Sequence, residues 1–229
     1  AVLRREKVVV FGDYDVDGAT SAALLILLLR QLGIEPRAYI PDRMTEGYGP
    51  SGPALLRLKE EGASLIVTVD CGAQAFEALD AAREAKVDVV VVDHHKCAAA
   101  LPYAHALVNP NRMDEREGAE HGHLAAVGVA FLLGAALLRT LRTRGWFTSR
   151  PEPKLIELLD LVALGTVADV AQLRGLNRAF VAQGLKVMAQ RRNLGLAALI
   201  EASRLTRAPT CSDLGFALGP RINAGGRVG

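Results

Sequence analysis

The chain has 229 residues, half of them apolar, and a net charge of only +2, so it can bury the core of one large or two modest domains. Its three cysteines (Cys71, Cys97 and Cys211) form no CxxC pair, which argues against a disulfide framework or a cysteine-built zinc site and favours a reducing, cytoplasmic compartment. The longest uncharged apolar stretch, 124–138, is shorter than the ~20 residues that span a bilayer, so we expect a buried helix there and no membrane segment.

Short Val-rich runs alternate with helical segments along the first half of the chain. We predict strands at 7–12, 37–40, 64–69, 87–92 and 104–108, with helices at 19–32, 54–61 and 75–85 between them. This alternation is typical of an α/β domain whose parallel β-sheet is covered by helices on both faces. Further helices are expected at roughly 124–143, 153–164, 175–191 and 195–202.

The sequence also suggests a division of the chain. We assign residues 1–170 to the α/β domain and 171–229 to a helical, basic extension that leads toward a second domain, mostly absent from what we expect to be a fragment. From 174 to 229 there are nine Arg and Lys against two acids, a net charge of +7, which leaves −5 on the rest. An acidic part beside a basic part suits a phosphate-rich polymer as substrate, although a solvated basic helix face explains the same charge equally well.

Acids and histidines follow several of the predicted strands. They are Asp13, Asp15 and Asp17 after the first strand, Asp70 after the third, Asp93, His94 and His95 after the fourth, and Asp169 in LGTVAD. Because the carboxyl ends of parallel strands share one edge of a sheet, we expect these groups to converge. Carboxylates that close together repel unless cations lie between them, and oxygen ligands with imidazole suit Mn²⁺ or Mg²⁺. The pattern predicts a di-metal site of the kind that hydrolyses phosphoesters.

Each motif has a second interpretation. DYDVDG at 13–18 matches the start of a calcium-binding EF-hand loop, but position 12 of such a loop would be Leu24 instead of Glu, and a strand precedes it, so we reject calcium sensing. Taken alone, Asp70 would be a helix cap and Asp169 a helix terminus. The pair His94 and His95 could be solvated loop residues, but burial after six apolar residues favours a metal or hydrogen-bonded role.

Together, GDYDVDGATS, TVDCG, VVDHH and LGTVADV resemble the four ordered motifs of the DHH phosphoesterase family. LVNPNR, AAVGVAFLL and LGPRINAGGRV are similar to the branch of that family formed by bacterial single-strand-specific 5′→3′ DNA exonucleases. The resemblance implies that Asp15, Asp17, Asp70, His94 and Asp169 are metal ligands, with Asp70 as the bridge. It also implies that His95 contacts the scissile phosphate and that Asp93 supports it.

The match departs from the family pattern at a few positions. Many members place a histidine ligand slightly earlier, where this chain has Phe11, so we expect Asp13 to help hold the first metal. Cys71 stands where Asn is common and Ala126 where Gly is common, and neither change should affect the chemistry. Arg221 and Asn223 match a motif that binds phosphate or a strand terminus.

The leading hypothesis is therefore hydrolysis of single-stranded DNA from its 5′ end to 5′-mononucleotides, with two divalent ions, in DNA repair and recombination. The strand would lie in a narrow channel, and the basic, aromatic stretch that contains Arg142 and Trp146 could line it, although a capped end of an amphipathic helix explains these residues equally well. Expected partners are single-stranded DNA and a helicase or single-strand-binding protein, with a monomeric enzyme. Two alternatives remain: a family phosphoesterase for short oligonucleotides, cyclic dinucleotides or pyrophosphate, and a non-catalytic nucleic-acid-binding subunit.

Overall fold

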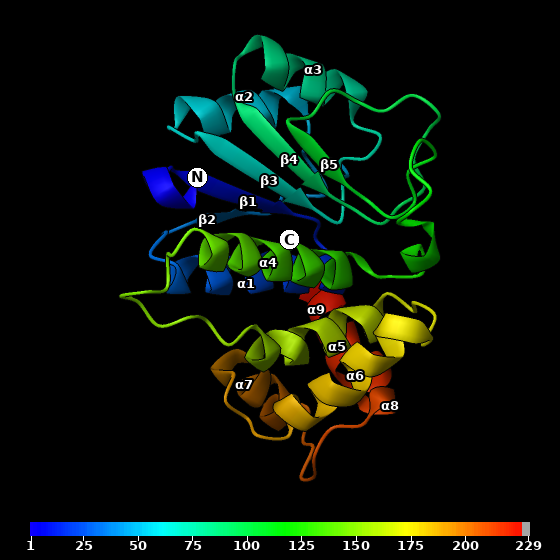
Figure 1. Cartoon of the computed structure of the whole chain (residues 1–229). Coiled ribbons are helices and arrows are strands. Elements are labelled where there is room, and N and C mark those ends of the chain that lie inside the picture. Colours follow the sequence, from blue (N-terminus) through cyan, green and yellow to red (C-terminus); the bar gives the residue numbers. More distant parts are fainter. Residues whose placement is uncertain (226–229) are drawn as a thin grey trace.

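The computed structural model describes residues 1–225 and places a parallel sheet at the centre of the first half of the chain (Figure 1). Within this range the sheet has five strands in the order β2-β1-β3-β4-β5, and every neighbouring pair is parallel. The strands are β1 (Val8–Gly12), β2 (Arg37–Tyr39), β3 (Leu65–Val69), β4 (Asp88–Val92) and β5 (Ala106–Val108). The predicted strands are confirmed, and the parallel pairing brings all their carboxyl ends to one edge.

Helices cover both faces of the sheet, as predicted (Figure 1). On one face lie α2 (Gly52–Glu60) and α3 (Phe76–Glu84), and on the other α1 (Val16–Gln31) and α4 (Ala126–Thr143). Alternate side chains of β1 separate the two cores: Val9 and Phe11 pack under α2 and α3, whereas Val8 and Val10 pack under α1 and α4. Because helices cover both faces of the sheet, the sequences of β1, β3 and β4 are rich in Val and Ile.

The second half of the described chain is helical and packs below α1 (Figure 1). It contains α5 (Leu159–Ala168), α6 (Gly175–Met188), α7 (Leu194–Ala202) and α8 (Cys211–Asp213), then a π-helical turn (Leu214–Leu218) and α9 (Gly219–Gly225). Short 3-10 turns occupy Val2–Arg4, Ala119–His121 and Leu155–Leu158. One apolar cluster runs from α1 and α4 through α5 to α6 and α7, so the helices after residue 170 share the core of the preceding domain. The division at 170 stays a prediction.

Two differences from the predicted elements matter for the site. α1 begins at Val16 and not at residue 19, because the Asp15 carboxylate accepts a hydrogen bond of 2.9 Å from the Gly18 N–H and caps the helix. Asp17 is thereby placed inside the first turn of α1 instead of in a loop. The turns from 211 to 225 were not predicted, and the end of the LGPRINAGGRV motif, from residue 226, lies outside the described residues.

Among residues 1–225, one helix is long and apolar enough to cross a membrane by length and composition, and it is α4. Half of that span is buried in the structure, where α4 packs on α1 and against β3 and β4. The prediction of a buried core helix at this place is confirmed.

Candidate metal and active site

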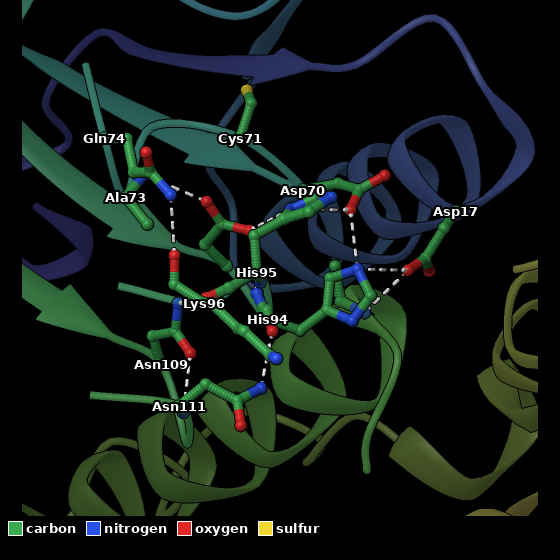
Figure 2. Close-up of polar contacts among 12 residues, drawn as sticks. Asp17, Asp70, Cys71, Ala73, Gln74, His94, His95, Lys96, Asn109 and Asn111 are labelled. Carbon is green, nitrogen blue, oxygen red and sulfur yellow. Dashed lines mark hydrogen bonds and ion pairs between the residues drawn. The ribbon is translucent and has the colours of Figure 1, made fainter. Parts of the chain in front are cut away.

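The ends of β1, β3 and β4 place acids and histidines in one small volume above the sheet edge (Figure 2). Backbone hydrogen bonds continue the sheet one residue past its strands: the Asp70 N–H donates to the Val92 carbonyl and the Asp93 N–H to the Val108 carbonyl, both at 3.0 Å. These bonds fix the two residues at the start of their loops. The predicted convergence of the strand-end residues is therefore observed.

A first group of possible ligands consists of Asp13, Asp15 and Asp70, whose oxygens lie within 4.8 Å of one another. Asp13 and Asp70 are buried, and one oxygen of each accepts no hydrogen bond from residues 1–225. Burial raises the pKa of Asp13 to about 6. Burial and the nearby Asp17 and Asp15 also raise the pKa of Asp70 well above its usual value.

A second group consists of Asp17, His94 and Asp169, again with ligand atoms within 4.8 Å. Asp17 is 1% exposed, and burial with repulsion from Asp169 raises its pKa. Its two oxygens accept hydrogen bonds from the N–H groups of Ala126 (2.6 Å) and Val127 (2.9 Å) at the start of α4. Asp169 lies at the carboxyl end of α5, and burial is the main cause of its raised pKa.

His94 connects the groups. Its Nδ1 lies 3.0 Å from the Leu124 carbonyl, an arrangement in which Nδ1 carries the proton and Nε2 keeps a free lone pair. Nε2 lies 3.2 Å from Asp70 Oδ1 and 3.8 Å from Asp17 Oδ2, and within residues 1–225 it makes no hydrogen bond. Figure 2 shows the imidazole edge directed at both carboxylates. This nitrogen is oriented as a ligand.

His95 is held by Asp93. The Asp93 Oδ1 accepts hydrogen bonds from His95 Nδ1 (2.7 Å) and from the N–H groups of His94 and His95, and Oδ2 accepts one from the Ala73 N–H (2.9 Å). Burial alone would raise the pKa of Asp93, but the bonds from His95 and Ala73 hold it below its usual value. The same bond raises the pKa of His95, whose side chain is 49% exposed. Asp93 therefore orients an imidazole that faces outward.

The residues present fit divalent cations. The donor set is carboxylate oxygen and imidazole nitrogen without a thiolate, which suits Mn²⁺ or Mg²⁺. Buried carboxylates with raised pKa values would be stabilised by a divalent cation, as would the atoms of Asp13, Asp70 and His94 that have no hydrogen-bond partner within residues 1–225. Asp70 and His94 each belong to two of the three groups, the third being Asp70, His94 and His95, so the positions overlap.

A family profile described as the DHH family, N-terminal domain, matches residues 7–166, which include every candidate metal ligand except Asp169. The chain belongs to the DHH family. Among curated DHH proteins it is similar to the single-stranded-DNA-specific exonuclease RecJ of Dickeya dadantii, with 46% identity over 100% of this chain and 40% of the relative. The RecJ of Thermus thermophilus is 37% identical over 100% of this chain and 32% of the relative.

Solved structures of DHH-family proteins support this family assignment. An exonuclease RecJ bound to manganese superposes with a TM-score of 0.83 at 36% identity, over 99% of this chain and 55% of that one. RecJ from Thermus thermophilus in complex with Mn²⁺ gives a TM-score of 0.79 at 34% identity, over 100% of this chain and 31% of that one. The chain spans about 40% of the length of the Dickeya dadantii RecJ.

Several residues of this DHH site had no predicted role. Asn111, from LVNPNR, donates from Nδ2 to the carbonyls of His94 (2.6 Å) and Gly122 (3.0 Å), and Asn109 donates to that of His95 (2.8 Å). Gly165 lies so close to Asp17 that a Cβ there would come within 3.0 Å of its Oδ1 and 2.3 Å of Thr20 Oγ1. The signal was present in the sequence, as Asn and Gly inside the family motifs, but only the fold shows what they contact.

The candidate substrate-binding residues are divided between two places. Asn223 lies at the site, where its Oδ1 accepts a hydrogen bond of 3.1 Å from the Val16 N–H beside Asp15 and Asp17. Arg221, two residues earlier on α9, is exposed and donates to the Ala217 carbonyl at 2.6 Å.

The structure does not bring Arg142 and Trp146 to the site. α4 points its first turn at Asp17, so Arg142, sixteen residues later, lies about 24 Å further along the helix axis. There Arg142 pairs with Glu152 (Nε–Oε2 3.1 Å), and Trp146 packs on the core beneath Arg150, whose guanidinium carbon lies 4.1 Å from the ring centroid. These contacts describe a capped helix end, which was the alternative interpretation.

Proposed function

We propose that this protein is a metal-dependent 5′→3′ exonuclease that hydrolyses single-stranded DNA to 5′-mononucleotides, in DNA repair and recombination. The observation that carries the proposal is the overlap at Asp70 and His94, which lets two divalent ions, Mn²⁺ or Mg²⁺, share ligands. The similarity to RecJ exonucleases, whose solved structures contain Mn²⁺ or Mg²⁺, supports both the substrate and the ions.

The proposed ligands are Asp13, Asp15, Asp17, Asp70, His94 and Asp169. When bound, such a pair of ions supplies an activated water and stabilises the leaving oxygen of an in-line displacement. The chain must hold the ligands rigid, and it does so with the α4 amides on Asp17, the Leu124 carbonyl on His94 and the α1 cap at Asp15. A ligand set fixed by backbone groups needs little rearrangement when the ions bind.

His95 is proposed to contact the scissile phosphate. Its Nδ1–H is occupied by Asp93, so Nε2 is the nitrogen left for the substrate. Since Asp93 raises the pKa of His95, the protonated imidazole persists to higher pH and can donate a hydrogen bond to a phosphate oxygen. Asp93 itself does not reach the reacting atoms in this scheme and acts by orienting His95.

We place the DNA terminus near Asn223, which lies at the α1 side of the site, and near Arg221, two residues earlier on α9. We further propose that the enzyme is monomeric and cytoplasmic, and that it works with a helicase or a single-strand-binding protein. The net charge of +7 from residue 174 onward supports a polyanionic substrate.

The test is digestion of a long single strand labelled at its 5′ or 3′ end, with Mn²⁺, Mg²⁺ or a chelator. We expect labelled mononucleotide to be released at once from the 5′ label, with progressive shortening of the 3′-labelled strand, and no reaction with chelator. Cleavage restricted to short oligonucleotides, cyclic dinucleotides or pyrophosphate would favour the second family activity. Strand binding without hydrolysis of any substrate in Mn²⁺ would identify a non-catalytic subunit.

A further inference from the structure

The side chain of Asn177, in the first turn of α6, joins two loops that lead to the candidate metal site. It is completely buried, with 0% of its surface exposed. Its Nδ2 donates a hydrogen bond of 2.6 Å to the His123 carbonyl, just before α4, and one of 3.0 Å to the Gln172 carbonyl, between α5 and α6. One side-chain amide thus ties together two segments that are distant in the sequence. No role proposed above uses this residue.

The first of these segments, residues 123–127, supports two candidate ligands. His94 Nδ1 lies 3.0 Å from the Leu124 carbonyl, and Asp17 accepts hydrogen bonds from the first N–H groups of α4. Because His123 directly precedes Leu124, a hydrogen bond to the His123 carbonyl restrains the peptide that leads into this support. The position of the segment therefore sets where the imidazole of His94 and the carboxylate of Asp17 lie.

The second segment carries the third ligand of the same group, Asp169, in a strained turn. Val170 has φ +57, a left-handed conformation that is unfavourable for a β-branched residue. Its side chain is 87% exposed, so packing does not stabilise this conformation. The turn depends on hydrogen bonds made around it, and the bond from Asn177 to the Gln172 carbonyl, three residues after Asp169, is one of them.

We propose that Asn177 is a positioning residue for one of the two metal positions, the one formed by the second group of ligands, Asp17, His94 and Asp169. The inference rests on the proposed two-ion site and not on the proposed substrate. Every ligand of the second group is carried or supported by one of the two segments that Asn177 joins. The first group is held instead by the hydrogen bonds of the sheet edge and by the cap of α1. Loss of the Asn177 amide should therefore disturb one ion and spare the other.

The test is calorimetric titration of the metal-free protein with Mn²⁺, which needs neither DNA nor turnover. The unmodified protein should bind two ions. Asn177→Leu keeps nearly the same side-chain volume but has no amide to donate. It should weaken one ion about 10- to 100-fold, the loss typical of groups that orient metal ligands, and change the other by less than about twofold.

Two further variants identify the weakened ion. Asp13 belongs only to the first group of ligands and Asp169 only to the second. In Asp13→Ala, the remaining ion should still be weakened by Asn177→Leu. In Asp169→Ala, the remaining ion should bind equally well with and without Asn177→Leu. A weakened ion in the Asp169→Ala background would overturn the inference.

Asn193→Leu is the matched control. Asn193 also bonds to the main chain, accepting from the Leu196 N–H at 3.2 Å, but it caps α7, in the helical half away from the sheet (Figure 1). Thermal unfolding should show a loss of stability in both variants, and Asn193→Leu should leave both Mn²⁺ affinities unchanged. Equal weakening of both ions in Asn177→Leu, or weakening of neither, would overturn the inference, because a general loosening of the fold does not select one ion.

Asn177→Ser, whose hydroxyl cannot reach both carbonyls, is the second variant and should show the same selective loss. If both Asn177 variants fail to fold, the residue serves the fold as a whole and the inference is rejected. A single ion in the unmodified protein would reject the two-ion proposal. Unchanged affinity of that ion in Asn177→Leu would then reject the inference as well, whereas weakened affinity would retain it.

Discussion

The side chain of Asp17 accepts a hydrogen bond of 2.9 Å from the backbone N–H of Val127, which follows it by 110 residues in the chain. The first turn of one helix thus places a carboxylate on the amino end of another, where free N–H groups and the helix dipole favour a negative charge. Burial and the repulsion by Asp169 act in the opposite direction and raise the pKa of Asp17. Because these effects oppose each other, a cation that binds beside Asp17 should change its protonation state readily.

The first prediction concerns the stability of the metal-free protein. In the folded state, burial raises the pKa of Asp13 to about 6 and raises those of Asp17, Asp70 and Asp169, so these acids hold protons that the unfolded chain, with pKa values of about 3.9, has released. The free energy of unfolding must then fall as pH rises from about 4 through 6 and beyond. Urea unfolding in chelator between pH 5 and pH 8 measures this, and saturating Mn²⁺ should remove the decline. A flat or rising stability in chelator would contradict it.

The second prediction concerns Asp70→Ala. Asp70 contributes an oxygen to two of the three ligand groups, so its loss should lower cleavage by at least ~10³-fold, a loss expected for a transition-state contribution of about 4 kcal/mol. Binding of single-stranded DNA should persist. Steady-state cleavage and fluorescence anisotropy give the two quantities, and Asp88→Ala, which removes an exposed acid at the start of β4, is the control. Undiminished turnover in Asp70→Ala would end the metal hypothesis.

The third prediction concerns Asp93→Asn. Because the hydrogen bond that His95 Nδ1 donates to Asp93 is the main cause of the raised pKa of His95, the neutral amide should let that pKa fall. If protonated His95 contacts the phosphate, the alkaline limb of the pH–rate profile moves to lower pH, and activity at pH 8 falls by about 10- to 100-fold, as for other orienting carboxylates. NMR titration of the His95 ring gives the pKa directly. A shifted ring pKa with an unmoved pH–rate profile would remove His95 from the reaction.

The fourth prediction concerns Asn111→Ala. Asn111 bridges the carbonyls of His94 and Gly122, and its loss leaves two partly buried acceptors without a donor, so unfolding should become easier by about 1–3 kcal/mol. Displacement of His94 should weaken Mn²⁺ binding about tenfold, measured by calorimetry. Asn111→Asp keeps the size but cannot donate, so it should fail to rescue. Mn²⁺ affinity that is unchanged in both variants would limit Asn111 to a structural role.

The fifth prediction separates the two groups of candidate substrate-binding residues. Arg142→Ala removes an exposed ion pair with Glu152, which is worth about 0–1 kcal/mol, at the end of α4 remote from the site. The KM for single-stranded DNA should change by less than about twofold. Asn223→Ala, beside the first turn of α1, should raise that KM severalfold. The reverse ranking would place the strand on the α4 end and not on α9.

The local sequence was sufficient for the elements that carry the acids. Continuous Val and Ile with helical segments between them leave few options besides a covered parallel sheet, and a parallel sheet brings its strand ends to one edge. This is why Asp13, Asp15, Asp70, His94 and His95 could be assigned to one place before the fold was known. Their spacing along the chain and the polarity of the strands are properties of the sequence alone.

Contacts between distant segments were decided only by tertiary structure. The direction of α4 brings its amides to Asp17 and carries Arg142 away, and no local pattern encodes the direction in which one helix crosses another. The hydrogen bond from Tyr48 to Asp70 and the bridge that Asn111 forms likewise depend on where two loops meet. Local sequence sets backbone geometry and burial periodicity over a few residues, whereas these contacts arise from how the whole core packs.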